Sequence, residues 1–323
     1  MMLLEIDKLN LKFKTSKGTI HAIRDLSFSL NQGETLGIVG ESGCGKSITN
    51  LAIMGLLPDT AELSASKLHF EGNDLLSLKE KQWQALRGGD IAMIFQDPMT
   101  ALNPSFTVGY QIEETLALHR TDLTKNQRKE FVFDLLDQVG IPAPRERAKS
   151  YAHELSGGMS QRVMIAQAIA CNPKLLIADE PTTALDVTIQ DQILKLLKDI
   201  QAKNNMAMIL VTHDLGVVAE NSDRIQVMYA GEVIETGSAR DIIETPQHPY
   251  TNGLLSSLPG KSKGGFRSKL PSIAGMVPDL RARPSGCQFN PRCEYQTEQC
   301  LKEMPSLTLE NHAVSCFHPL IQG

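Results

Sequence analysis

A short glycine-rich segment near the start of the chain has the pattern of a phosphate-binding loop. Residues 40–47 have the sequence GESGCGKS, which matches G-x-x-x-x-G-K-[ST] at every fixed position. Glycines let backbone N–H groups turn toward an anion, and a helix that begins after the loop adds positive potential. In this pattern Lys46 holds the β- and γ-phosphates of a nucleotide and the Ser47 hydroxyl binds Mg²⁺. The predicted nucleotide-binding residues are Gly40, Glu41, Ser42, Gly43, Cys44, Gly45, Lys46 and Ser47.

Two adjacent carboxylates follow an apolar segment much further along the chain. Residues Leu175–Ala178 are apolar, and Asp179 and Glu180 come directly after them. An apolar strand that ends in this way places Asp179 to complete the Mg²⁺ shell and Glu180 to polarise an attacking water. Many buried strands end in acids, so the pair alone would be weak evidence. Together with the phosphate loop, it predicts nucleotide hydrolysis.

Cys44 lies beside Lys46, at the expected N-terminus of the helix that follows the loop. A helix N-terminus and a neighbouring cation both favour the thiolate. The sequence therefore predicts a lowered pKa for this thiol and rapid alkylation that MgATP should slow.

Four of the six cysteines are gathered in the tail, with five, six and fifteen residues between successive members. Thiolates bind zinc or iron–sulfur clusters, but structural zinc sites usually have closer C-x-x-C pairs, so the spacing leaves the metal open. His312 and His318 are alternative zinc ligands, and free thiols are a further possibility. We expect the module to be separate from the phosphate site. The four cysteines are Cys287, Cys293, Cys300 and Cys316.

The 323 residues suit one large domain with an appendage. A formal net charge of -5 gives no basic excess that would favour nucleic acid. The opening residues lack the layout of a signal peptide, and no apolar run has the length of a membrane span. We therefore expect a cytosolic chain whose membrane role depends on partners.

Apolar segments rich in β-branched residues alternate with helical patterns. This alternation at Thr35–Val39, Leu175–Ala178 and Met208–Thr212 predicts a mainly parallel sheet covered by helices. The opening segments Leu3–Phe13 and Ala22–Leu30 alternate more and predict antiparallel strands.

The middle and the end of the chain have different patterns. Residues 98–170 are predicted to form a helical subdomain, in which Asn126–Val139 is the clearest amphipathic stretch. Pro259–Pro284 is rich in Gly, Pro, Ser, Lys and Arg, and predicts a loop that leads to the cysteines.

The segment Leu155–Arg162, with the sequence LSGGMSQR, resembles the signature motif of the ABC ATPase family. The resemblance implies that Ser156, Gly157 and Gly158 bind the γ-phosphate of ATP held by an opposite subunit. A helix N-terminus that offers a hydroxyl and bare N–H groups suits that role. One subunit would then carry half of each of two sites.

Other residues match the same family one by one. Gln96 resembles the glutamine that senses Mg²⁺ and water, and His213 resembles the switch histidine at the γ-phosphate. Residues Ala184–Asp186 resemble the loop that communicates across the dimer. The aromatic residue that stacks on adenine is assigned to Phe13, with Ile20 at a competing position.

Two sequence segments resemble, more narrowly, the dipeptide and oligopeptide importer ATPases. They are FQDPMTALNP at residues 95–104 and PQHPYT at residues 246–251. Some members of that group carry a 4Fe-4S cluster in their tail, which favours such a cluster over zinc here. Importers of nickel, haem or antimicrobial peptides are alternatives. A soluble ABC ATPase is less favoured, because a second motor domain and a long coiled coil are both lacking.

The resemblance implies an α/β fold, with a P-loop ABC ATPase core, an antiparallel β subdomain, a helical subdomain and a small cysteine-rich module. We expect the nucleotide-binding domain at residues 1–245 and a C-terminal extension at residues 246–323. ATP and Mg²⁺ are the implied ligands. The implied partners are a second ATP-binding subunit, with a paralogue favoured, two permease subunits and, indirectly, an extracytoplasmic solute-binding protein. The chain would act at the cytoplasmic face of the inner membrane.

Overall fold

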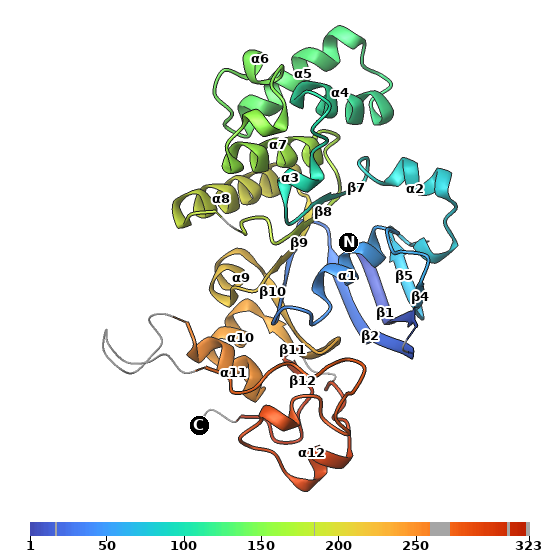
Figure 1. Cartoon of the computed structure of the whole chain (residues 1–323), viewed down its shortest axis with the longest axis vertical. Coiled ribbons are helices and arrows are strands. Elements are labelled where there is room, and N and C mark those ends of the chain that lie inside the picture. Colours follow the sequence, from blue (N-terminus) through green and yellow to red (C-terminus); the bar gives the residue numbers. More distant parts are fainter. Residues whose placement is uncertain (17, 184, 259–271, 309–310, 321–323) are drawn as a thin grey trace. The chain divides into compact units, whose positions relative to one another are not determined.

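The computed structural model describes residues 1–16, 18–183, 185–258, 272–308 and 311–320 (Figure 1). The chain forms two compact units. The first consists of Met1–Leu30, Thr35–Leu76 and Leu210–Gly323, and the second of Asn31–Glu34 and Ser77–Ile209. Within the described ranges, none of the helices combines the length and the apolar character that a membrane span requires.

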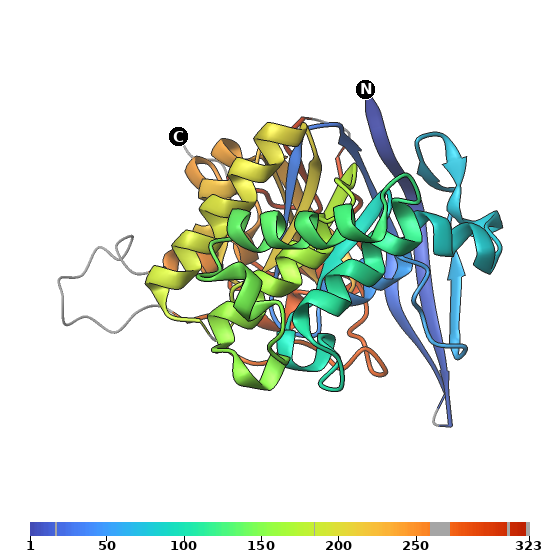
Figure 2. The ribbon, with the colours of Figure 1, turned by 90° about the horizontal axis from the view of Figure 1, so that it is seen from above.

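An antiparallel sheet forms the beginning of the first unit. Its strands are β1 (Met2–Thr15), β2 (Gly18–Asn31), β4 (Ala61–Ser64), β5 (Lys67–Phe70) and β6 (Asn73–Asp74). The order is β2-β1-β5-β6, and β4 also pairs with β1. Figure 2 shows β1 and β2 as two long neighbouring ribbons. In β1, Leu9 and Leu11 are buried while Lys8 and Lys12 are exposed, so the alternation predicted from the sequence is confirmed.

A second group of strands in the first unit positions the phosphate loop. The order is β12-β11-β10-β3, and β10 runs parallel to β3 and antiparallel to β11. All five residues of β3 are buried, which explains its continuous apolar sequence. The strands are β3 (Thr35–Val39), β10 (Arg224–Tyr229), β11 (Glu232–Ser238) and β12 (Ala313–Val314). The helices are α1 (Lys46–Ile53), α9 (Leu215–Asn221), α10 (Ala239–Glu244) and α11 (Pro249–Ser256).

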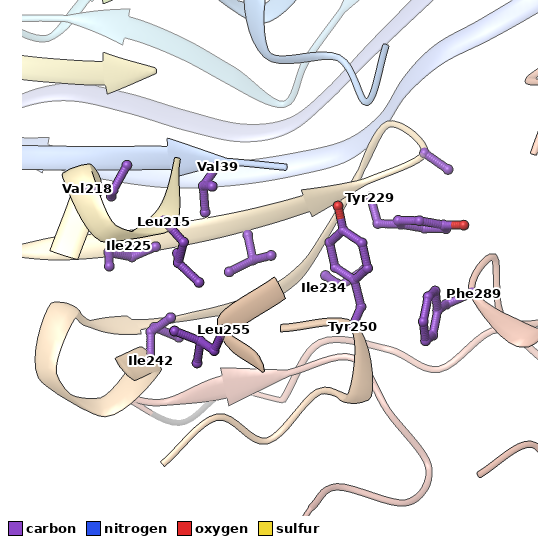
Figure 3. Close-up of a cluster of buried hydrophobic side chains, with 12 residues drawn as sticks. Val39, Leu215, Val218, Ile225, Tyr229, Ile234, Ile242, Tyr250, Leu255 and Phe289 are labelled. Atoms are coloured by element: carbon purple, nitrogen blue, oxygen red, sulfur yellow. The ribbon is translucent and has the colours of Figure 1, made fainter. Parts of the chain in front are cut away.

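One buried cluster joins these strands to the tail of the chain (Figure 3). Tyr229 of β10 meets Tyr250 of α11 edge to face, with ring centroids 4.8 Å apart. Phe289 packs against both rings, with centroids 5.3 and 5.4 Å away. The tail adds η3 (Asn290–Arg292) and α12 (Glu298–Lys302). Residues beyond 245 thus contribute to the core of the first unit.

The second unit is mainly helical and contains two parallel strands, β7 and β8. Helices α3 to α7 occupy residues 98–169, as expected, and α5 coincides with the predicted amphipathic stretch. The short helix η1 (Leu75–Ser77) leads into this unit, and β9 (Ala207–Thr212) leads out of it. The other elements are α2 (Glu80–Leu86), β7 (Ile91–Ile94), α3 (Pro98–Ala101), α4 (Val108–His119), α5 (Lys125–Gln138), α6 (Pro144–Arg147), η2 (Ala152–Glu154), α7 (Gly157–Ile169), β8 (Leu175–Asp179) and α8 (Val187–Asn204).

Candidate functional site

The predicted phosphate loop lies between β3 and α1, where three glycines are required by geometry. Gly43 and Gly45 have φ angles of 79° and 111°, a region in which a side chain is strained. A Cβ on Gly40 would lie 2.3 Å from the carbonyl oxygen of Met228, so a larger residue has no room. The backbone conformation of the loop therefore depends on these positions.

Lys46 is the first residue of α1 and is almost completely buried. Its Nζ donates hydrogen bonds to the carbonyl oxygens of Gly40, at 2.8 Å, and Glu41, at 3.2 Å. These bonds fold the ammonium back over the loop, where its charge reinforces the positive end of the helix. Ser47 follows on the same first turn and is exposed.

Cys44 differs from the sequence prediction. Its side chain is fully buried, and its Sγ lies 3.8 Å from Lys46 Nζ. Burial raises the pKa of the Cys44 thiol, although Lys46 acts in the opposite direction. The predicted low pKa is wrong, because removal of the thiolate from water outweighs the nearby charge.

In the second unit, the carboxylate predicted to act as a base is held by two side-chain donors. Glu180 Oε2 accepts a hydrogen bond of 3.0 Å from Gln96 Nε2 and one of 2.8 Å from Thr183 Oγ1. Glu180 also has a φ of 48°, a conformation that is uncommon outside glycine and is found at functional sites. Asp179 precedes it at the buried end of β8. Gln96 and Glu180 are therefore brought together.

Thr183 was absent from the residues predicted from the sequence. It lies three residues after Glu180 in a turn, in which the Thr183 N–H donates to the Glu180 carbonyl oxygen at 3.2 Å. That spacing is a local signal that could have identified it.

The signature segment forms the N-terminus of α7. Ser156 caps the helix, and its Oγ accepts a hydrogen bond from the Met159 N–H at 3.4 Å. A Cβ added to Gly157 would find no other atom within 4 Å, and one on Gly158 would make only ordinary contact with Ile189. Packing therefore does not require glycine at either position.

The remaining predicted residues have the following places. His213 follows β9 and is exposed, and the next residue, Asp214, caps α9. Phe13 lies on β1 opposite Ala61 of β4, with a half-buried side chain, and Ile20 on β2 is similarly half-buried. Ala184, which begins the predicted communicating loop, lies outside the described residues.

Comparisons with known proteins identify the family to which the chain belongs. The family profile described as ABC transporter matches residues 23–183, and the profile described as oligopeptide/dipeptide transporter, C-terminal region, matches residues 234–300. The dipeptide transport ATP-binding protein DppD of Escherichia coli is 52% identical over 99% of this chain and 98% of its own length. DppD of Haemophilus influenzae is 54% identical over 99% of this chain and 96% of its own length. The chain is an ABC transporter ATP-binding protein of the dipeptide/oligopeptide type.

Solved ABC structures confirm the α/β cassette fold. A dimeric, post-hydrolysis structure of the ATP-binding cassette MJ0796 bound to ADP and Pi is 27% identical, has a TM-score of 0.65, and covers 73% of this chain and 99% of its own. CbiO1 of Clostridium perfringens, part of an ABC transporter complex, is also 27% identical, with a TM-score of 0.64 and coverages of 76% and 91%. The ABC profile includes the phosphate loop, Gln96, the signature and Glu180.

The four tail cysteines of this ABC protein line one small cavity of about 10 Å³, together with His248 and His318. That volume is about the room of one water molecule. Burial raises the pKa of the Cys287 thiol to about 11, and it also raises the pKa values of Cys293 and Cys316. In the parts of the chain that the structure describes, no three His, Cys, Asp or Glu side chains have the arrangement of a metal-binding group.

His312, the other alternative zinc ligand, is engaged elsewhere. Its Nε2 pairs with Glu235 Oε1 at 2.7 Å, and its Nδ1 lies 3.3 Å from Gln247 Nε2. Both ring nitrogens therefore have partners outside the cavity, and the sequence prediction that His312 could bind zinc is wrong.

Proposed function

We propose that this chain is the ATP-hydrolysing motor of an importer for dipeptides or oligopeptides. The observation that carries the proposal is the carboxylate of Glu180, fixed by Gln96 and Thr183 at the end of β8. A nucleotide-binding protein without turnover would have no need of an oriented carboxylate that follows the Mg²⁺-binding aspartate.

In this proposal the phosphate loop binds and orients the ATP phosphates. The N–H groups of the loop and the Lys46 ammonium would bind the β- and γ-phosphates, and Ser47 and Asp179 would hold the metal. Mg²⁺, when bound, spreads the developing negative charge. Glu180 orients the attacking water and takes up its proton, and His213 contacts the γ-phosphate. Phe13 is proposed to stack on adenine.

The signature residues are proposed to act on the nucleotide of a second ATP-binding subunit. Ser156, Gly157 and Gly158 offer a hydroxyl and accessible N–H groups at a helix N-terminus. ATP would then join two motors, and hydrolysis would release them. The dimeric structure of MJ0796 supports this arrangement by similarity.

Two substitutions separate binding from hydrolysis. Glu180→Gln should leave MgATP affinity intact and reduce kcat by about 10²- to 10⁴-fold, because the base is lost while the phosphate cradle remains. Lys46→Ala should instead weaken nucleotide binding itself. Turnover is measured as phosphate release with the partner motor present. Undiminished turnover in Glu180→Gln would reject the catalytic assignment, and unchanged affinity in Lys46→Ala would reject the phosphate-loop assignment.

The peptide substrate is proposed from the relatives named for dipeptide and oligopeptide transport. The partners would be a second motor, favoured as a paralogue, two permease subunits and, indirectly, a solute-binding protein. The chain would act peripherally at the cytoplasmic face of the inner membrane. Residues 1–245 would form its nucleotide-binding domain, and residues 246–323 would form its C-terminal extension. Reconstitution with permease subunits of a peptide importer tests the substrate, because uptake of nickel or haem rather than peptides would overturn it.

We also propose that Cys287, Cys293, Cys300 and Cys316 hold a 4Fe-4S cluster, with zinc as the alternative. The four thiols line one cavity, and thiolate is the donor that both zinc and iron–sulfur clusters take. The cavity has the room of about one water molecule, so its loops would have to move apart to admit a cluster. A bound metal would favour the thiolate forms of Cys287, Cys293 and Cys316, whose pKa values burial otherwise raises, and would hold the loops that carry the four cysteines in place. Anaerobic purification followed by iron and zinc analysis distinguishes the two metals. Four thiols that alkylate freely in the native protein would eliminate both.

A further inference from the structure

The second residue of the phosphate loop is held by two side chains from beyond residue 245. The guanidinium of Arg292 makes a bidentate ion pair with Glu41: Nη1 lies 2.9 Å from Oε2 and Nη2 lies 3.1 Å from Oε1. The backbone N–H of Glu41 also donates a hydrogen bond of 2.9 Å to the hydroxyl of Tyr250. All three residues belong to the first unit. The C-terminal extension therefore contacts both the carboxylate and the backbone of Glu41 in the loop.

Arg292 is itself fixed in place. Its side chain is only 5% exposed. The guanidinium lies 5.8 and 5.9 Å from the ring centroids of Tyr229 and Phe289, and its Nε donates to the carbonyl oxygen of Ala274 at 2.8 Å. Burial opposes its charge, but hydrogen bonds to Glu41 and Tyr229 outweigh that effect, and the pKa of Arg292 is raised. A planar, charged fork held on several sides is suited to orient a carboxylate.

Glu41 creates an electrostatic problem for a loop that binds phosphates. Its side chain is 28% exposed, so solvent screens its negative charge only in part. The loop also links Glu41 to the catalytic lysine, because Lys46 donates to the Glu41 carbonyl oxygen. A displaced Glu41 would therefore both repel an incoming nucleotide and change the bonds that hold Lys46.

We propose that Arg292 is a positioning residue of the nucleotide site, which neutralises Glu41 and fixes the first half of the phosphate loop. The inference rests on the proposed binding of ATP by this loop. By this proposal the C-terminal extension is part of the nucleotide site. The contact is made by Arg292, which directly precedes Cys293 of the cysteine cavity.

Arg283 provides a matched control. It also lies in the extension and is similarly buried, with a side chain 7% exposed. Arg283 attaches the extension to β11 and β2 rather than to the phosphate loop. Its Nη1 lies 3.6 Å from Glu232 Oε1, and its Nη2 donates to the His21 carbonyl oxygen at 2.7 Å. Replacement of Arg283 weakens the anchoring of the tail without touching the Glu41 carboxylate.

The experiment compares MgATP affinity in Arg292→Gln, Arg283→Gln, Glu41→Gln and the double variant Glu41→Gln/Arg292→Gln. Titration with a fluorescent ATP analogue gives Kd, and phosphate release gives kcat. Arg292→Gln should raise Kd about tenfold, equivalent to about 1.4 kcal/mol, while Arg283→Gln should leave it near the wild-type value. In the Glu41→Gln background, Arg292→Gln should have little further effect, because the charge that it compensates is gone.

Alkylation of Cys44 supplies a readout that needs no nucleotide. Cys44 belongs to the loop and its side chain is fully buried, so the thiol can be labelled only when the loop opens. Peptide mass spectrometry follows the labelling rate. The rate should rise in Arg292→Gln and stay low in Arg283→Gln. Three results would overturn the inference: an unchanged Kd in Arg292→Gln, equal losses in both arginine variants, or an undiminished effect of Arg292→Gln in the Glu41→Gln background. If the wild-type protein binds no MgATP, the proposed function is overturned. The labelling rates of Cys44 would then still show whether Arg292 holds the loop in place.

Discussion

Replacement of Thr183 tests whether its hydroxyl orients Glu180, the carboxylate proposed to act as the catalytic base. Thr183→Val keeps the branched shape and removes the 2.8 Å hydrogen bond to Glu180 Oε2. A hydrogen bond to a charged group contributes about 1.5–3 kcal/mol, and the partial burial of this one favours the lower end of that range. About 1.5 kcal/mol corresponds to roughly a tenfold loss in kcat. The KM for MgATP should change little, because the hydroxyl is not assigned to the nucleotide.

Steady-state phosphate release, with the partner motor present, measures both constants. Thr183→Ser restores the hydroxyl and should recover most of the rate. Gln96→Ala removes the other donor to the same oxygen, so its combination with Thr183→Val should be non-additive. A wild-type kcat in Thr183→Val would refute the positioning argument. A rise in KM without a fall in kcat would place the hydroxyl in nucleotide binding instead.

Three other residues give shorter tests. Tyr250→Phe keeps the buried ring but removes the acceptor of the Glu41 N–H, so the free energy of unfolding should fall by about 1 kcal/mol in urea denaturation. An unchanged value would mean that water replaces the hydroxyl. At neutral pH, maleimide should label buried Cys44 more slowly than half-buried Cys171, and peptide mapping measures both rates. Faster labelling of Cys44 would contradict the conclusion that burial protects its thiol. Cys300→Ser should lower the metal content of anaerobically purified protein, and an unchanged content would remove Cys300 from the ligand set.

The parts of the molecule that local rules determine were predictable from the sequence. The segment Thr35–Val39 is continuously apolar because β3 is buried throughout, and such a segment has few alternatives. The phosphate loop was recognisable because Gly43 and Gly45 adopt φ angles that other residues avoid. Gln96 and Glu180 could be paired only through the resemblance to the family, since the chain between them gives no local signal of their contact.

Long-range contacts and burial were beyond the sequence. Glu41 and Arg292 are 251 residues apart, and no periodicity or motif connects two charges at that distance. The position of Cys44 near a helix N-terminus was correct, but its pKa depends on burial, which neighbours distant in the sequence produce. The contacts of Arg292 and Tyr250 with Glu41 could not be predicted for the same reason.

The support of the phosphate loop by distant residues has a consequence for the boundary at residue 245. Glycines allow the loop its conformation but also make it costly to order, so it depends on contacts from outside its own segment. Tyr250 and Phe289 are almost fully buried in the core of the first unit, and Arg292 is fixed against that same cluster. A chain that ends at residue 245 would lose all three and would expose the surface that they cover. We expect such a fragment to unfold at lower urea concentration than the whole chain and to bind MgATP at least about tenfold more weakly, the loss expected for Arg292→Gln alone. A fragment with the affinity of the whole chain would show that the extension contributes nothing to the nucleotide site.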